Sequence, residues 1–357
     1  MLLSILRAFI SAWERTHILD LSLSDEQRQL VEVFAAIYGR ESTSERVRAA
    51  EPLGFDDKLW KALAETGAVD MAVDEAAGGG GASELDLALI AEQFGRAVAS
   101  APVVEAQVAA RLLARCGDDR ADLLGRVLAG ERLVTFAPRA ARGGALELVP
   151  AGAVADAVIA LADGRLVVAP VGATRRPVQN LGSLPLADVE VDDDAAVLAE
   201  GEDASRLHSE ALDLWLTLTA AALAGAAKKA VEIGVEYAKE RHAFGTPIGT
   251  FQAVSHPLAD SATAADGARL LALKAACAFV DEPARTSELA AMAFTFAYET
   301  ARDATYRSLH IHGGYGFGME CDAQLYYRRV RGWAMVYGEP GVALDRVADA
   351  RYGPVAG

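Results

Sequence analysis

Apolar positions along the chain change their spacing twice, and these changes divide the sequence into three parts. From residue 21 to 130 they recur at intervals of three and four residues, the spacing that gives a helix one apolar face. The first such face consists of Leu30, Val33, Phe34 and Ile37. Ser24 is a residue type that caps helix N-termini, so we expect this helix to begin at Asp25.

Two further helices are predicted in this first part of the chain. One covers 56–67, where Gly67 is a plausible C-cap, and the other covers 85–96. The glycines at 78–81 precede the second of them and indicate a turn. No Lys-Ser or Lys-Thr pair follows these glycines, as a phosphate-binding loop would require.

Between residues 131 and 205 the apolar residues stand in short runs rich in Val, Ile and Leu, which favours strands. These runs are 133–136, 157–161, 165–169 and 189–191. The sequence Ala-Asp-Gly at 162–164 is typical of a hairpin turn between two of them. We therefore expect a small, all-β middle domain.

After residue 206 the helical spacing returns. The predicted helices are 207–240, 250–281, 285–311, 322–336 and 341–350. The resulting fold class is α+β: an N-terminal helical domain over 21–130, a reduced β domain over 131–205 and a C-terminal four-helix bundle over 206–357. Residues 1–20 are set apart as a leader or extension.

The composition narrows the range of functions. The 357 residues carry a formal charge of −16, from 34 basic and 50 acidic side chains, which argues against a nucleic-acid-binding role. Cys116, Cys277 and Cys321 have neither metal nor redox spacing, and so sparse a set fits a reducing cytoplasm. Residues 1–20 favour a short amphipathic helix over a signal peptide, and the apolar run at 214–227 is too short to span a bilayer.

Two segments in the last part of the chain carry candidate chemistry. Residues 237–256 read YAKERHAFGTPIGTFQAVSH. Arg241 in this segment offers a planar, permanently charged guanidinium that suits a pyrophosphate, and Phe244 can pack on a flat ring. Residues 310–317 read HIHGGYGF, where adjacent glycines let backbone amides approach a phosphate closely.

Together these segments resemble the signature of the acyl-CoA dehydrogenase family, and the order of helical, β and helical domains is similar too. The resemblance implies FAD-dependent oxidation of an acyl-CoA thioester, with an electron-transferring flavoprotein as the usual acceptor. It also implies that the flavin contacted belongs to the neighbouring subunit. The cofactor-binding residues it implies are Arg241, Phe244, Gln252, His310, His312, Gly313 and Gly314. Family members commonly carry Gln at the place of His310. His310 and His312 could be taken for metal ligands, but the sequence offers no third ligand near them, so we expect no metal site.

The chain departs from the family pattern where the chemistry occurs. A carboxylate must remove the α-proton while hydride leaves Cβ for flavin N5. Many members carry this glutamate shortly after the Gly-Gly segment, where this chain has Tyr337, and others carry it on the first bundle helix, where it has Trp215. Glu339 is displaced by two residues. Residues 134–141, VTFAPRAA, also lack the acidic, Gly- and Ser-containing part of the loop that holds the flavin ring in the family.

We therefore expect no catalytic residue in this chain. The interpretation is a subunit of a heteromeric acyl-CoA dehydrogenase, α2β2, in which a homologous partner supplies the glutamate and the ring loop. It looks similar to the paired dehydrogenases of bacterial steroid side-chain degradation, which implies a bulky acyl-CoA substrate. Two alternatives stay open: a self-sufficient homo-oligomeric enzyme that uses Glu339 as its base, and a flavin-free scaffold or acyl-CoA-binding subunit.

Overall fold

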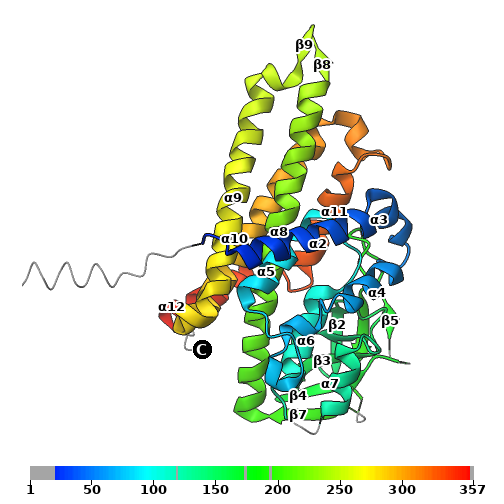
Figure 1. The fold of residues 1–357 in the computed structure, drawn as a ribbon, viewed down its shortest axis with the longest axis vertical. Helices are drawn as coiled ribbons and strands as arrows, with labels where there is room; N and C mark the ends of the chain where they lie inside the picture. The colour runs from blue at the N-terminus through cyan, green and yellow to red at the C-terminus, as the bar shows by residue number, and fades with distance from the viewer. Residues whose placement is uncertain (1–20, 118–119, 173–174, 193–194, 354–357) are drawn as a thin grey trace, which may run out of the picture.

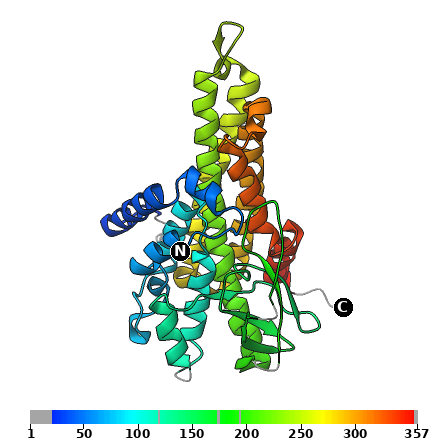
Figure 2. The same ribbon diagram turned by 90° about the vertical axis from the view of Figure 1, so that its right-hand side faces the viewer.

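A computed structural model describes residues 21–117, 120–172, 175–192 and 195–353. The molecule is elongated, with the N-terminal helices and the strands at one end and the helical bundle extending to the other (Figure 1, Figure 2). The expected leader at 1–20 lies outside the described residues. The predicted α+β class is confirmed, whereas the domain boundaries near residues 130 and 205 stay predictions.

The N-terminal part is helical, as predicted. Its helices are α2 (Asp25–Glu41), α3 (Ser44–Ala50), α4 (Asp57–Glu65), α5 (Glu84–Arg96), α6 (Val103–Ala114) and α7 (Ala121–Leu128), with 3-10 turns η1 (Asp70–Ala72) and η2 (Glu75–Ala77). Ser24 begins α2 with a full capping box, in which its hydroxyl accepts from the Gln27 amide and the Gln27 side chain accepts from the Ser24 amide. The predicted starts at Asp25 and near residue 85 are therefore confirmed, and Asp56 caps α4.

Two small sheets form the middle of the chain. Their strands are β1 (Val134–Phe136), β2 (Ala145–Val149), β3 (Ala157–Ala162), β4 (Arg165–Pro170), β5 (Arg176–Pro177), β6 (Ala187–Glu190) and β7 (Ala196–Glu200). One sheet has the order β1-β3-β4-β7, with β1 parallel to β3, and the other has the order β2-β6-β5. The hairpin turn is confirmed, since Asp163 and Gly164 adopt φ of 48° and 72°. The strands β2, β5 and β7 were not predicted.

The C-terminal part is a bundle of long helices joined by short links. The helices are α8 (Gly201–Glu240), α9 (Gln252–Asp281), α10 (Thr286–Ile311), α11 (Ala323–Met335) and α12 (Pro340–Tyr352). The links include the hairpin β8 (His242–Ala243) and β9 (Thr246–Pro247), and the 3-10 turns η4 (Ile248–Thr250), η5 (Pro283–Arg285) and η6 (Gly313–Phe317). The five predicted helices are present, but α8 begins at Gly201 rather than at Leu207 because it follows β7 directly.

Helix α8 is the axis of the molecule. It runs from β7 at the bottom of Figure 1 to the β8–β9 hairpin at the top, packing against α5, α9 and α10 on the way. Its contact with α5 depends on small residues: a methyl group on Gly95 would overlap the Ala222 carbonyl, and one on Gly225 would overlap the Glu92 carbonyl. Although α8 is apolar and long enough to span a membrane, 94% of its most apolar window is buried inside the protein, so it is a core helix.

Candidate functional site

The hairpin that ends α8 presents the first group of predicted cofactor residues at the tip of the bundle (Figure 1). Arg241 and Gln252 are exposed, at the end of α8 and the start of α9. Phe244 is 97% exposed and adopts φ of 53°, a left-handed conformation that is unfavourable for a bulky residue. Its ring meets Phe251 edge to face, with the centroids 6.2 Å apart. Phe244 is therefore a large apolar side chain that is exposed to solvent on an unfavourable backbone conformation.

The second predicted segment lies after α10. His310 is exposed, with its ring stacked on Tyr306 at 5.8 Å. His312 is buried: its ring stacks on Tyr237 at 4.1 Å, and its Nδ1 donates to the Ser308 carbonyl at 2.7 Å. Because Tyr237 lies in the last turn of α8, this stack joins the second segment to the base of the hairpin.

The two glycines of the second segment leave their surroundings open. Gly313 adopts φ of 59°, and no atom lies within 4 Å of the place where a Cβ would stand at Gly313 or Gly314. A flat or phosphate-bearing group could therefore approach this backbone closely. The buried His312 ring has no such freedom, so it serves to hold the segment against α8.

No cluster of three His, Cys, Asp or Glu side chains capable of holding a metal ion occurs in the described part of the chain.

The two positions at which the family resemblance placed a base are in contact with each other. The rings of Trp215 on α8 and Tyr337 after α11 lie 6.2 Å apart, and Phe294 on α10 packs against both at 5.9 Å. All three residues are buried, and burial raises the pKa of the Tyr337 hydroxyl. An aromatic cluster thus fills the space that a catalytic carboxylate would need. The nearby carboxylate, Glu339, is exposed and begins α12.

Trp215 also borders a partly open cavity of about 50 Å³. Its walls come from α5, α6, α8 and α11, together with loop residues around 150 and 184–186. Trp215 Nε1 donates to Glu105 Oε1 at 3.2 Å, and burial raises the pKa of Glu105. None of the seven predicted cofactor residues lines this cavity. The exposed surface at the bundle tip and the cavity beside Trp215 are therefore separate places in the chain.

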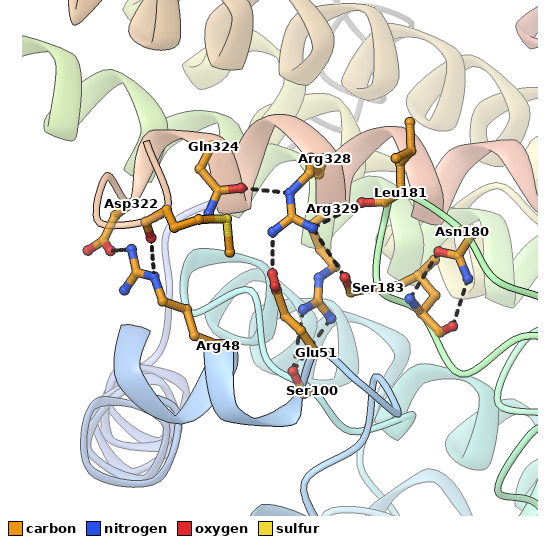
Figure 3. A network of polar contacts seen from close by, with 12 residues as sticks. Arg48, Glu51, Ser100, Asn180, Leu181, Ser183, Asp322, Gln324, Arg328 and Arg329 are labelled. Carbon is orange, nitrogen blue, oxygen red and sulfur yellow. Dashed lines mark hydrogen bonds and ion pairs between the residues drawn. The ribbon is translucent and has the colours of Figure 1, made fainter. Parts of the chain in front are cut away.

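A polar network fastens α11 and the loop at 180–184 over this cavity (Figure 3). The Arg328 guanidinium forms an ion pair with Glu51 and donates to Leu181 O and Ser183 Oγ at 3.2 and 3.1 Å. Within the loop, Asn180 accepts from the Leu184 amide and donates to the Leu184 carbonyl. The cavity wall at 184–186 is thus held by charge-assisted hydrogen bonds.

The segment at 134–141, which stands where the family has its flavin-ring loop, buries the Thr135 hydroxyl and the Ala137 carbonyl. Thr135 is fully buried and donates to the Pro150 carbonyl at 2.6 Å. The Ala137 carbonyl lies 3.1 Å from His208 Nε2 on α8. This segment packs against the protein interior and offers no acidic or hydroxyl side chain at its exposed end.

Glu105, Arg329 and Trp333, which all line the cavity, were not singled out from the sequence. The run RRVRGW around Arg329 has the composition of a solvated helix face, and Glu105 stands alone among apolar residues. A signal was nevertheless present, since Glu105 falls in the middle of an apolar helical run, where an isolated carboxylate is unusual.

The domain order and the two segments define one class of protein. The N-terminal domain model of acyl-CoA dehydrogenases matches residues 24–131, and the C-terminal domain model matches 207–351. The chain belongs to the acyl-CoA dehydrogenase family, oxidoreductases that act on CH–CH bonds. The resemblance drawn from the sequence is confirmed.

Particular relatives extend this assignment over nearly the whole chain. Acyl-CoA dehydrogenase IpdE2 of Mycolicibacterium smegmatis is 33% identical over 331 residues, covering 91% of this chain and 98% of the relative. The solved Tcur3481-Tcur3483 steroid ACAD G363A variant is 28% identical with a TM-score of 0.82, covering 92% of this chain and 98% of that chain. The ChsE4-ChsE5 complex from Mycobacterium tuberculosis has a TM-score of 0.85 at 24% identity, covering 94% and 100%, and supports the fold alone.

Proposed function

We propose that this chain is a flavin-sharing subunit of a heteromeric acyl-CoA dehydrogenase and contributes no catalytic base. The observation that carries the proposal is the contact between Trp215 and Tyr337, because it fills both places where the family keeps its glutamate. Glu339 is an exposed residue at a helix start, and a general base must reach the substrate proton within hydrogen-bond distance. The base then comes from a homologous partner subunit, in an α2β2 assembly.

The residues at the bundle tip fit part of an FAD site. Arg241 would bind the pyrophosphate, Phe244 would pack on a flat ring, and Gln252 would donate or accept beside them. The backbone at Gly313 and Gly314 has open space in front of it, which a phosphate or ribityl group could occupy. His310 is exposed and available for a side-chain contact, whereas His312 acts through its backbone and through its stack on Tyr237.

The outward placement of this surface supports the sharing of the cofactor between subunits. Phe244 and Arg241 face solvent, away from the cavity of their own chain. They would therefore hold an FAD whose reactive ring lies in the partner's active site. Bound FAD would supply the acceptor for the hydride that leaves the substrate Cβ. The contribution of this chain is to bind and orient that cofactor.

The substrate we propose is a bulky acyl-CoA thioester, possessing a steroid-derived side chain, which is oxidised to the 2,3-enoyl product. This rests on the 28% identity to a protein described as a steroid ACAD and on the pairing of two names in that description. An electron-transferring flavoprotein, the usual acceptor of the family, would reoxidise the complex. The expected location is the cytoplasm, in keeping with the three free cysteines.

Glu339→Gln, made in the complex with the partner, separates this proposal from a self-sufficient enzyme. We expect kcat/KM to stay within about twofold of the wild-type complex, because an exposed helix-start carboxylate takes no part in the chemistry. The matched experiment replaces by Gln the glutamate that we propose the partner subunit supplies as the base. A loss of two or more orders of magnitude for Glu339→Gln would return the base to this chain.

Arg241→Ala tests the remaining alternative, a flavin-free scaffold. We expect the purified complex to lose FAD, because an exposed guanidinium on the pyrophosphate is removed. Unchanged flavin content in Arg241→Ala would favour the scaffold.

A further inference from the structure

Arg329 on α11 is a buried cation, and no carboxylate of the described residues forms an ion pair with it. Its side chain is 2% exposed and lines the 50 Å³ cavity. The hydrogen bonds of its guanidinium run from both terminal nitrogens to Ser100 Oγ, each at 3.5 Å, which is the outer limit of such a bond. Among the residues that the structure describes, no carboxylate lies within 4 Å of it. A buried charge of this kind is costly unless something pairs with it.

The nearest carboxylate is already engaged. Glu51 forms its ion pair with Arg328, the neighbouring residue on α11, and Figure 3 shows Arg329 reaching past this pair toward Ser100. Burial lowers the pKa of Arg329 to about 10, so the guanidinium is still charged at neutral pH. Glu105, the other carboxyl group on the cavity wall, accepts from Trp215, and burial raises its pKa. Glu51 raises the pKa of Arg329 only from beyond 4 Å, so neither carboxyl group forms an ion pair with Arg329.

The cavity has the size and chemistry for a small ligand. A buried water needs about 10–15 Å³ of such space, so 50 Å³ accommodates roughly three to five waters or one small ion. Apart from Arg329, Glu105 and Thr219, the residues that line the cavity are apolar or aromatic. Five N–H donors in a planar fork select a planar oxyanion over a spherical or neutral ligand.

We propose that the cavity beside Arg329 binds a small planar oxyanion, a carboxylate of the size of formate or acetate or a bicarbonate ion. The Arg329 fork would pair with two oxygens of the anion. Such a ligand would neutralise the buried charge of Arg329 and so stabilise the subunit. The inference is independent of the proposed flavin sharing, since none of the predicted cofactor residues lines the cavity.

Thermal unfolding of the full chain with added sodium formate tests this proposal. Sodium gluconate, a carboxylate too large for the cavity, holds the ionic strength constant. We expect a saturable rise of the melting temperature of about 4 °C at a formate concentration a hundred times its Kd. Acetate should act similarly, and butyrate should stabilise less, because its chain exceeds the 50 Å³ of the cavity. Titration calorimetry gives the Kd directly.

Arg329→Met should abolish the formate effect, because it keeps an unbranched apolar stem and removes the fork. Arg331→Met is the matched control on the same helix, since that guanidinium stacks on Tyr327 at 3.7 Å, away from the cavity wall. If Arg329→Met does not fold, Arg329→Lys, which keeps the charge and loses the planar fork, and the size series on the wild type decide the matter. No stabilisation by formate, equal stabilisation by butyrate, or an effect that survives in Arg329→Met would each overturn the proposal.

Discussion

Phe244→Ala is the sharpest single test of the exposed surface at the bundle tip. Phe244 is 97% exposed, and its recorded ring contact is with Phe251. Removing an exposed side chain changes the free energy of unfolding of the isolated chain by no more than about 0.5 kcal/mol. Folding should therefore be almost unaffected by this substitution.

The effect on cofactor binding should be much larger. A phenylalanine side chain that goes from full exposure to burial contributes about 1.5–3 kcal/mol. Taking about 2 kcal/mol for a ring that packs on the cofactor, the Kd for FAD should rise roughly thirtyfold. The difference between a small effect on folding and a large effect on binding follows directly from the exposure of Phe244.

The assay is a titration of the apo-complex with FAD, followed by flavin fluorescence, alongside urea unfolding of each variant. Leu181→Ala is a suitable control, because Leu181 is 86% exposed and lies on the loop far along the sequence from the hairpin. Its Kd for FAD should match that of the wild type. An unchanged Kd in Phe244→Ala would refute the placement of the cofactor against this hairpin.

Two further substitutions test the interior. Arg346 donates to the buried Asp213 Oδ1 at 2.6 and 3.1 Å and so fastens α12 to α8. Arg346→Met should lower the free energy of unfolding, measured in urea, by about 3 kcal/mol, because it leaves the buried Asp213 carboxylate without its cation. Adding Asp213→Asn should restore part of this loss. A loss below about 1 kcal/mol would contradict the expectation. Burial raises the pKa of Glu105, so the stability that its protonated form contributes is complete below about pH 4.5 and is lost as the pH rises through the folded pKa. The free energy of unfolding can be measured in urea for the wild type and for Glu105→Gln from pH 4.5 to 7.5. The wild-type value minus the variant value should fall with rising pH, and a constant or growing difference would count against a raised pKa of Glu105.

The long helices could be predicted because their apolar spacing persists over many turns and their ends carry capping signals. Ser24 and Asp25 show this at α2, where the capping box forms as expected. The strands β5 and β7 could not be predicted from the sequence. Strand β5 (Arg176–Pro177) is only two residues long, and β7 (Ala196–Glu200) has no alternation of buried and exposed positions. Short edge strands are defined by their neighbours rather than by their own sequence.

The candidate site also has a part that the sequence predicts and a part that it does not. The exposed segments around Arg241 and Gly313 have local motifs and could be singled out from the sequence. The contact between Trp215 and Tyr337 joins α8 to the link between α11 and α12, and only the tertiary structure brings these distant positions together. The unpaired charge of Arg329 was equally hidden, because a run of arginines in a helix ordinarily faces solvent.

The central claim is that this chain holds part of a flavin site that a partner completes. The most direct measurement is the flavin absorbance spectrum and the mass of the chain purified alone, and then with a homologous partner subunit produced beside it. We expect a colourless chain alone and one FAD per heterodimer with the partner. A yellow homo-oligomer with one FAD per chain would contradict it and would make Glu339 the candidate base.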